Sequence, residues 1–209
     1  MTAALGNAGL GLFGGAFNPP HRTHRRIAEA ALQQLPVSEL RVLPAGDHPH
    51  KRDGDVAPAA DRLAMCELAF AGLPGVVVDD RELRRPGRSY TVTTLEEFAA
   101  AQPGRPLWFV IGADNLPLLP TWFRHHRLLE LARIATFPRL GCEVDETHLQ
   151  DLDLTAAERH HLLAHRLHMQ PDAVAAADLR RRLQVGERNL PELLPAVEAR
   201  IRTAHLYGT

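Results

Sequence analysis

The chain has 209 residues, which is enough for a globular domain with a sizeable hydrophobic core. Hydrophobic residues make up 45% of it and charged residues 23%, as in an ordinary globular protein. The formal net charge of −1 provides no overall field for nucleic acid or an anionic membrane surface. We therefore expect no nucleic-acid or membrane partner, and any anion-binding site must be local.

The two cysteines, Cys66 and Cys142, provide neither a disulfide framework nor the spacing of a metal site. The chain starts without a basic segment and a long apolar stretch, and contains no apolar run of about 18 residues. We expect a cytoplasmic protein that forms a single domain over residues 1–209. Its core should cover about 8–140, and a connector and helical C-terminal part about 141–209.

Short apolar runs predict five strands, which cover residues 10–13, 40–43, 76–78, 106–111 and 133–137. Between them, the 3.6-residue pattern predicts helices that end before Pro36 and that cover 58–70 and 92–101. This alternation predicts an α/β fold, with a Rossmann-like parallel sheet flanked by helices. A small helical C-terminal subdomain should follow, because residues 155–158 form a capping box.

The first predicted strand leads into a glycine turn and two histidines, within residues 14–24. Gly14 and Gly15 let backbone N–H groups approach an anion, and the next helix adds unpaired N–H donors. His21 and His24 are three residues apart, so they share a helical face and could donate hydrogen bonds to a triphosphate. The alternative is an ordinary turn followed by surface histidines. The spacing matches neither a dinucleotide-binding glycine motif nor a P-loop.

Ligands of parallel sheets bind at the carboxyl ends of the strands. We therefore expect Gly14, Pro44, Ser89 and Asp114 to lie along one edge. Another histidine group, at positions 161, 165 and 168, is spaced for one face of the helix that begins near Thr155. It lacks a fourth ligand for a zinc site, and we expect no protein-bound metal.

The glycine and histidine segment, residues 14–24, resembles the G-G-T-F-D-P-x-H-x-G-H signature of the nucleotidylyltransferase superfamily. It departs from the signature at Ala16, Asn18 and Thr23. Further segments, in the family's order, resemble the nicotinate-nucleotide adenylyltransferases. They are residues 44–51, 61–69, 82–85, 89–95, 109–114, 119–122, 193–195 and 206–207.

This resemblance implies transfer of AMP from ATP to nicotinate mononucleotide, giving deamido-NAD and pyrophosphate in NAD biosynthesis. ATP and nicotinate mononucleotide would be the partners, with Mg²⁺ arriving on ATP, and a homodimer is possible. The implied catalytic residues are His21, His24 and Arg180. The implied ATP-binding residues are Gly14, Gly15, Ala16, Phe17, Asn18, Asp114, Arg139 and Ala177. The implied substrate-binding residues are Lys51, Ser89, Tyr90, Thr91 and Trp122.

Several of these residues have simpler alternative roles. By resemblance, Lys51 meets the mononucleotide phosphate and Asp114 a ribose diol, but they could be a surface lysine and a helix N-cap. Trp122 could stack on the pyridine ring or belong to the core. Tyr90 and Thr91 match the segment that reads the nicotinate carboxylate, largely through backbone N–H groups.

The strongest departure from the family lies at residues 174–180, where a turn rich in hydroxyls would hold the triphosphate. The hydroxyls are absent here, while Arg180 remains. Backbone donors at a helix start survive such changes. The family's Arg-Pro-Gly likewise corresponds to Arg139, Leu140 and Gly141.

The expected mechanism is in-line attack by the mononucleotide phosphate on the α-phosphorus of ATP. The two histidines, the glycine amides, Arg180 and the metal would stabilise the charge. One alternative is a catalytically weakened nucleotide-binding homologue that serves as a sensor or subunit. Another is a sister adenylyltransferase that uses nicotinamide mononucleotide or phosphopantetheine.

Overall fold

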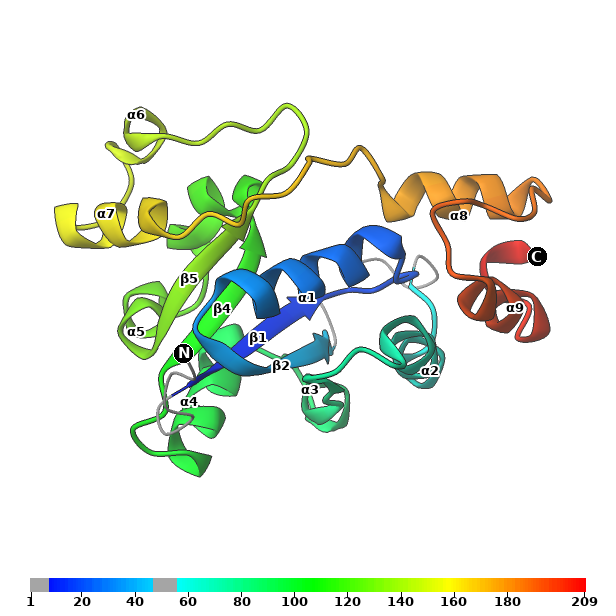
Figure 1. Cartoon of the computed structure of the whole chain (residues 1–209), viewed down its shortest axis with the longest axis horizontal. Helices are drawn as coiled ribbons and strands as arrows, with labels where there is room; N and C mark the ends of the chain where they lie inside the picture. The colour runs from blue at the N-terminus through cyan, green and yellow to red at the C-terminus, as the bar shows by residue number, and fades with distance from the viewer. Residues whose placement is uncertain (1–7, 47–55) are drawn as a thin grey trace.

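The computed structural model describes residues 8–46 and 56–209, which contain one five-stranded parallel sheet in the order β3-β2-β1-β4-β5. The strands are β1 (Gly9–Gly15), β2 (Val37–Pro44), β3 (Val76–Val78), β4 (Leu107–Gly112) and β5 (Ala132–Phe137). Helices flank the sheet (Figure 1). The predicted α/β, Rossmann-like fold is confirmed.

The helical segments follow the strands along the chain. They are α1 (Arg22–Gln34), α2 (Ala59–Phe70), α3 (Arg81–Arg84), α4 (Thr91–Ala101), the 3₁₀ segment η2 (Ala113–Thr121), α5 (His125–Leu131), α6 (Glu146–Leu149), α7 (Ala156–Ala164), α8 (Ala176–Gln184), α9 (Pro195–Thr203) and η3 (Leu206–Gly208). No helix in the described parts of the chain is long and apolar enough to cross a membrane.

The two faces of the sheet bury different halves of each strand, because successive side chains alternate. In β4, Trp108 and Val110 belong to one apolar cluster, and Leu107, Phe109 and Ile111 to the other. The first cluster includes residues of α1 and α2, and the second residues of α4 and α5. Every residue of β4 is buried, which explains its continuous apolar sequence.

The C-terminal helices divide between these two clusters. Leu149 of α6 and Leu162 of α7 join the cluster of α4 and α5, and α7 packs on β5. Leu183 of α8 and Ile201 of α9 join the cluster of α1 and α2, and α9 packs on α2. Figure 1 shows α6 and α7 on one side of the molecule and α8 and α9 on the other.

The predicted helix with three histidines is wrong at its C-terminal end. The helix α7 stops at Ala164, and His165 has extended backbone angles. The Thr136 N–H donates to the His165 carbonyl, and the Leu167 N–H donates to the Thr136 carbonyl, so this segment lies along β5. His168 therefore lies outside the helix, and the three histidines do not share a helical face. Pairing with an open sheet edge has prevailed over the helical pattern.

Candidate active site

A cavity of about 880 Å³ opens at the carboxyl ends of β1 and β4. The expected residues that line it are Gly14, Gly15, Ala16, Phe17, Asn18, His21, His24, Ser89, Thr91, Asp114, Trp122, Arg139, Ala177 and Arg180. Pro44 pairs with Gly15 at the same edge. Tyr90 is not among the lining residues, and Lys51 lies outside the described residues.

The two predicted histidines form a stacked pair at the start of α1. Their ring centroids are 3.8 Å apart and the ring planes are tilted by 35°. The Nδ1 atom of His24 accepts a hydrogen bond of 3.1 Å from the backbone N–H of His21. A neutral His24 must then carry its proton on Nε2, so this atom is a hydrogen-bond donor.

The environment keeps both imidazoles neutral at pH 7. Burial, together with the charge of Arg139, lowers the pKa of His21 to about 4. Burial, the neighbouring His21 and Arg139 hold the pKa of His24 well below its usual value. A bound anion would act in the opposite direction, because an adjacent negative charge favours the imidazolium.

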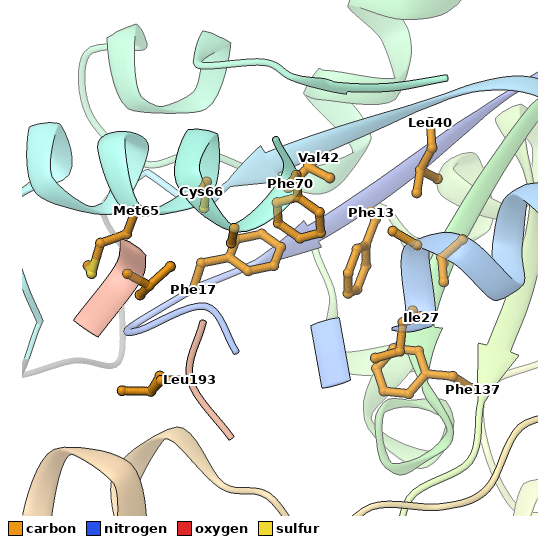
Figure 2. Close-up of a cluster of buried hydrophobic side chains, with 14 of the residues drawn as sticks. Phe13, Phe17, Ile27, Leu40, Val42, Met65, Cys66, Phe70, Phe137 and Leu193 are labelled. Atoms are coloured by element: carbon orange, nitrogen blue, oxygen red, sulfur yellow. The ribbon is translucent and has the colours of Figure 1, made fainter. Parts of the chain in front are cut away.

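The Phe17 ring packs edge-on against His24, one member of this pair. Phe17 is 2% exposed, and its centroid lies 5.0 Å from that of His24. Figure 2 shows its ring among Met65, Cys66 and Phe70 in the apolar cluster. Its backbone φ of 44° is in the left-handed region, which is unusual for a phenylalanine.

Arg62 is a positioning residue that the sequence analysis did not single out. Its side chain is buried and donates to the carbonyls of Ala16, Ala45 and Ala57, at 3.2, 2.7 and 3.2 Å. It thereby ties the loop after β1 to the loop after β2. The only signal in the sequence was its place in the family-like segment 61–69.

Asn18 also makes hydrogen bonds that hold several segments together. Its Oδ1 accepts from the Ala57 N–H at 2.9 Å and from the Tyr207 hydroxyl at 2.8 Å. Its backbone carbonyl accepts from Nη1 of Arg180, also at 2.9 Å. Arg180 is thus fixed where α8 meets the glycine loop, and its cationic group lines the cavity.

The helix α8 begins without a side-chain cap. Its N-cap is Ala175, and no cap hydrogen bond is made. The N–H groups of Ala176 and Ala177 have no acceptor one turn earlier in the helix, as at every helix start. The sequence change has removed the hydroxyls from this turn, but the backbone donors and the positive end of the helix dipole remain at the cavity wall.

Thr23 replaces the glycine of the resembled signature and makes a contact of its own. Its hydroxyl donates to Oδ2 of Asp172 at 2.5 Å, and Oδ1 of Asp172 accepts from the Val174 N–H at 3.0 Å. Burial opposes ionisation, but these hydrogen bonds and the nearby Arg26 hold the pKa of Asp172 below its usual value. This contact joins α1 to the segment before α8, and it uses the hydrogen-bond donor of the Thr23 hydroxyl.

Asp114 and Arg139 face each other across the end of β4. The Arg139 Nε lies 3.6 Å from Oδ1 of Asp114, whose side chain is 49% exposed. A Cβ on Gly112 would come within 2.2 Å of that Oδ1, so only glycine lets the carboxylate turn back to the strand end. Asp114 lies inside η2 and is not its N-cap, which removes the simplest alternative role.

A hydrogen-bonded network occupies another wall of the cavity. Oε1 of Glu82 accepts from the Thr94 hydroxyl at 2.7 Å, and Arg85 donates to Thr94 at 3.0 Å and to Ser89. Burial raises the pKa of Glu82, although hydrogen bonds from Thr94, Ser89 and the Gly46 N–H and the charge of Arg85 oppose this. The network joins the loop after β2 to the segment before α4.

Tyr90 and Trp122 have different environments. The Tyr90 ring packs on Phe123, with centroids 4.6 Å apart, and is not part of the cavity lining. Trp122 is half-buried, lines the cavity and lies edge-on to Phe109 at 6.1 Å. Tyr90 is the N-cap of α4, and the first helical residue, Thr91, reaches the cavity. The start of α4 thus presents unpaired N–H groups there.

One group of side chains within the described residues could hold a metal ion, namely His125, His126 and Asp153. None of the three lines the cavity. The predicted absence of a metal group at His161, His165 and His168 stays a prediction. In the structure, Nε2 of His161 accepts from the Ile134 N–H at 3.3 Å.

Known proteins resemble this chain over most of its length. The family model described as "Cytidylyltransferase-like" matches residues 12–176. A probable nicotinate-nucleotide adenylyltransferase from Albidiferax ferrireducens is 41% identical over 96% of this chain and 98% of its own. One from Rhodopirellula baltica is 35% identical over 88% and 86%.

A solved structure shares the fold. The Plasmodium falciparum nicotinic acid mononucleotide adenylyltransferase complexed with NaAD has a TM-score of 0.77 at 14% identity, and the match covers 96% of this chain and 98% of that one. Together with the ordered motifs and the cavity that they line, these similarities lead to one conclusion. The chain belongs to the nicotinate-nucleotide adenylyltransferase family of nucleotidyltransferases.

Proposed function

We propose that the protein transfers the adenylyl group of ATP to nicotinate mononucleotide, releasing pyrophosphate. The observation that carries this proposal is a single cavity lined by the stacked histidines and by Thr91 and Trp122. We call the walls around Gly14, Gly15, the two histidines, Asp114, Arg139 and residues 172–180 the triphosphate side. The walls around Glu82, Ser89, Thr91, Thr94 and Trp122 are the mononucleotide side.

The triphosphate side supplies donors and positive charge. His24 offers its Nε2 proton, and Arg180 and Arg139 supply guanidinium groups. The first N–H groups of α8 add donors that require no side chain. Asp114, which is half-exposed at the end of β4, would accept hydrogen bonds from a ribose diol.

The mononucleotide side offers a helix start and a flat aromatic surface. Unpaired N–H groups at the start of α4 suit the carboxylate of nicotinate, and Trp122 suits the pyridine ring. An amide in place of the carboxylate would carry no charge to complement these donors. Selection of the acid over the amide is expected from that difference.

The proposed reaction is an in-line displacement. A phosphate oxygen of the mononucleotide attacks the α-phosphorus of ATP, the new P–O bond forms, and the bond to pyrophosphate breaks. The attacking phosphate is already ionised, so it requires no general base. The side chains hold both phosphates in line and stabilise the charge that develops on the pyrophosphate.

Mg²⁺ fits this site as part of the ATP complex. No lining residue belongs to the one candidate metal group that the described residues contain. In this proposal the phosphate oxygens of ATP and water hold most of the coordination positions of the ion. When bound, it would neutralise charge on the departing pyrophosphate.

Pyrophosphate release tests the proposal directly. Purified protein receives ATP and Mg²⁺ with nicotinate mononucleotide, nicotinamide mononucleotide, phosphopantetheine or no acceptor. We expect release with the acid mononucleotide. Preference for another acceptor would identify a sister transferase. Nucleotide binding without pyrophosphate release from ATP, whichever acceptor is present, would identify a weakened homologue. The start of α8, which lacks hydroxyl side chains, is the specific argument for that alternative.

A further inference from the structure

Three possible ligand atoms converge away from the cavity, where α5 meets the connector before α7. His125 and His126 open α5, and Asp153 lies three residues before the first residue of α7. The Nε2 atoms of the two histidines lie 3.8 and 3.7 Å from Oδ2 of Asp153. The proposed function assigns no role to these residues.

These separations are close to those of a filled site. Tetrahedral zinc sites have ligand distances of about 2.0–2.1 Å, which places neighbouring ligand atoms about 3.3 Å apart. Both Nε2–Oδ2 distances exceed that value by about half an ångström or less. The carboxylate can close the gap because the side chain of Asp153 is 81% exposed.

Glu158 already orients one of these imidazoles. Nδ1 of His126 lies 2.7 Å from Oε1 of Glu158, so a neutral ring carries its proton there and directs the lone pair of Nε2 toward Asp153. The other oxygen of Glu158 accepts from the N–H of Thr155 at 2.7 Å, which holds the carboxylate in the capping box of α7. A carboxylate behind an imidazole is the usual outer partner of a metal-binding histidine.

His125 must change its tautomer and give up one hydrogen bond to join them. Its side chain is 10% exposed, and its Nε2 lies 3.0 Å from the carbonyl oxygen of Asp153. If the proton moves to Nδ1, Nε2 becomes a ligand and that hydrogen bond is lost. The two ring centroids are 3.9 Å apart, and the candidate ligand atoms of the three residues all lie within 4.8 Å of one another.

We propose that this cluster binds a divalent transition ion that prefers imidazole ligands, such as Zn²⁺. Nε2 of His125, Nε2 of His126 and a carboxylate oxygen of Asp153 are the protein ligands, and water completes the tetrahedron. The ion joins α5 to the connector before α7. The simpler arrangement is an ion pair of His126 with Asp153 and Glu158, without a metal.

Metal titration of the full chain separates these possibilities. Untagged protein is stripped with a chelator, freed of it, and titrated without nucleotide. Co²⁺ is followed by its visible absorption and Zn²⁺ by calorimetry. We expect one site in the wild-type protein and at least tenfold weaker binding in His126→Ala and Asp153→Asn. Glu158→Gln keeps the capping box and should weaken binding about 10- to 100-fold.

His160→Ala is the matched control, because His160 is an exposed histidine of α7 outside the cluster. Its metal binding should equal that of the wild type. Asp153→Asn changes an exposed side chain, so it remains informative if His126→Ala does not fold. The proposal is overturned by wild-type protein that binds neither ion at millimolar concentration. It is also overturned by a site that Asp153→Asn and Glu158→Gln leave unchanged.

Discussion

The triphosphate side and the mononucleotide side of the cavity are built in different ways. On the mononucleotide side, Glu82, Arg85 and Thr94 hold one another through side-chain hydrogen bonds. On the triphosphate side, α8 begins with alanines, and its donors are backbone N–H groups. A helix start keeps its donors whatever its side chains are. The start of α8 can therefore lack hydroxyl side chains and still offer donors. The network on the mononucleotide side requires its particular side chains.

Of the substitutions proposed to compare the two sides, replacing His24 with alanine should change the activity most. The variant removes the Nε2–H donor from the triphosphate side, and we expect kcat to fall about 10²- to 10³-fold. Stability should fall by only about 1 kcal/mol, from the lost hydrogen bond to the His21 N–H. Steady-state kinetics and thermal unfolding measure the two effects. His160→Ala is the surface control, and wild-type turnover in His24→Ala would refute the catalytic role.

The buried imidazoles also make the triphosphate side sensitive to acid. His21 has a pKa near 4 in the folded protein, below its ordinary value, so the unfolded chain binds more protons between these two values. Above the ordinary histidine pKa of 6.5, His21 does not change the free energy of unfolding with pH. Below that value, the free energy of unfolding declines as the pH falls toward 4. We expect a loss of roughly 3 kcal/mol by about pH 4.

Urea unfolding across this pH range, compared with His21→Gln, isolates the contribution of His21. The variant lacks the titrating group, so its stability should depend less on pH. Glu82 acts in the opposite direction, because its raised pKa favours the protonated folded form, but it is present in both proteins. Equal slopes for both proteins would contradict the buried, neutral state of His21.

Thr94→Val tests whether the mononucleotide side depends on its side-chain network. The hydroxyl that donates to Glu82 and accepts from Arg85 is lost while the shape is kept. We expect a KM for nicotinate mononucleotide about tenfold higher, with an unchanged KM for ATP. Thr93→Val, at a half-buried neighbour outside the network, is the control. A change confined to the KM for ATP would contradict the assignment of this network to the mononucleotide side.

Ala177→Ser should have the smallest effect. It restores one hydroxyl at the start of α8, where the triphosphate side has only backbone donors. One neutral hydrogen bond is worth about 0.5–1.5 kcal/mol, so the KM for ATP should fall about two- to tenfold. The KM for the mononucleotide, measured in the same assay, is the internal control. An unchanged KM for ATP would mean that the serine hydroxyl does not reach the phosphates.

The sequence predicted the sheet better than the helices that follow it. All five strands lie where apolar runs predicted them, and the differences are at their ends, as for β2, which begins at Val37 instead of Leu40. Strands buried on both faces need continuous apolar residues, so their signal is local. The end of α7 was wrong because His165 pairs with β5, a partner distant in sequence.

The candidate site shows the same division. Of the sixteen residues predicted at the site, fourteen line the cavity. Those predictions rested on the resemblance of ordered motifs to the family. The role of Arg62, the Thr23–Asp172 contact and the cluster of His125, His126 and Asp153 were missed. Each joins residues far apart in the chain, and single residues without a recognisable spacing give no local signal.

The sequence by itself determined the parallel sheet, its order of elements and the residue types at its carboxyl edge, because strand periodicity and turn chemistry are local properties. Tertiary structure decided how those residues act. Packing buries His21 and lowers its pKa, places Tyr90 against Phe123, and directs Arg180 to the carbonyl of Asn18. These outcomes depend on which distant segments meet, and burial and charge follow from that meeting.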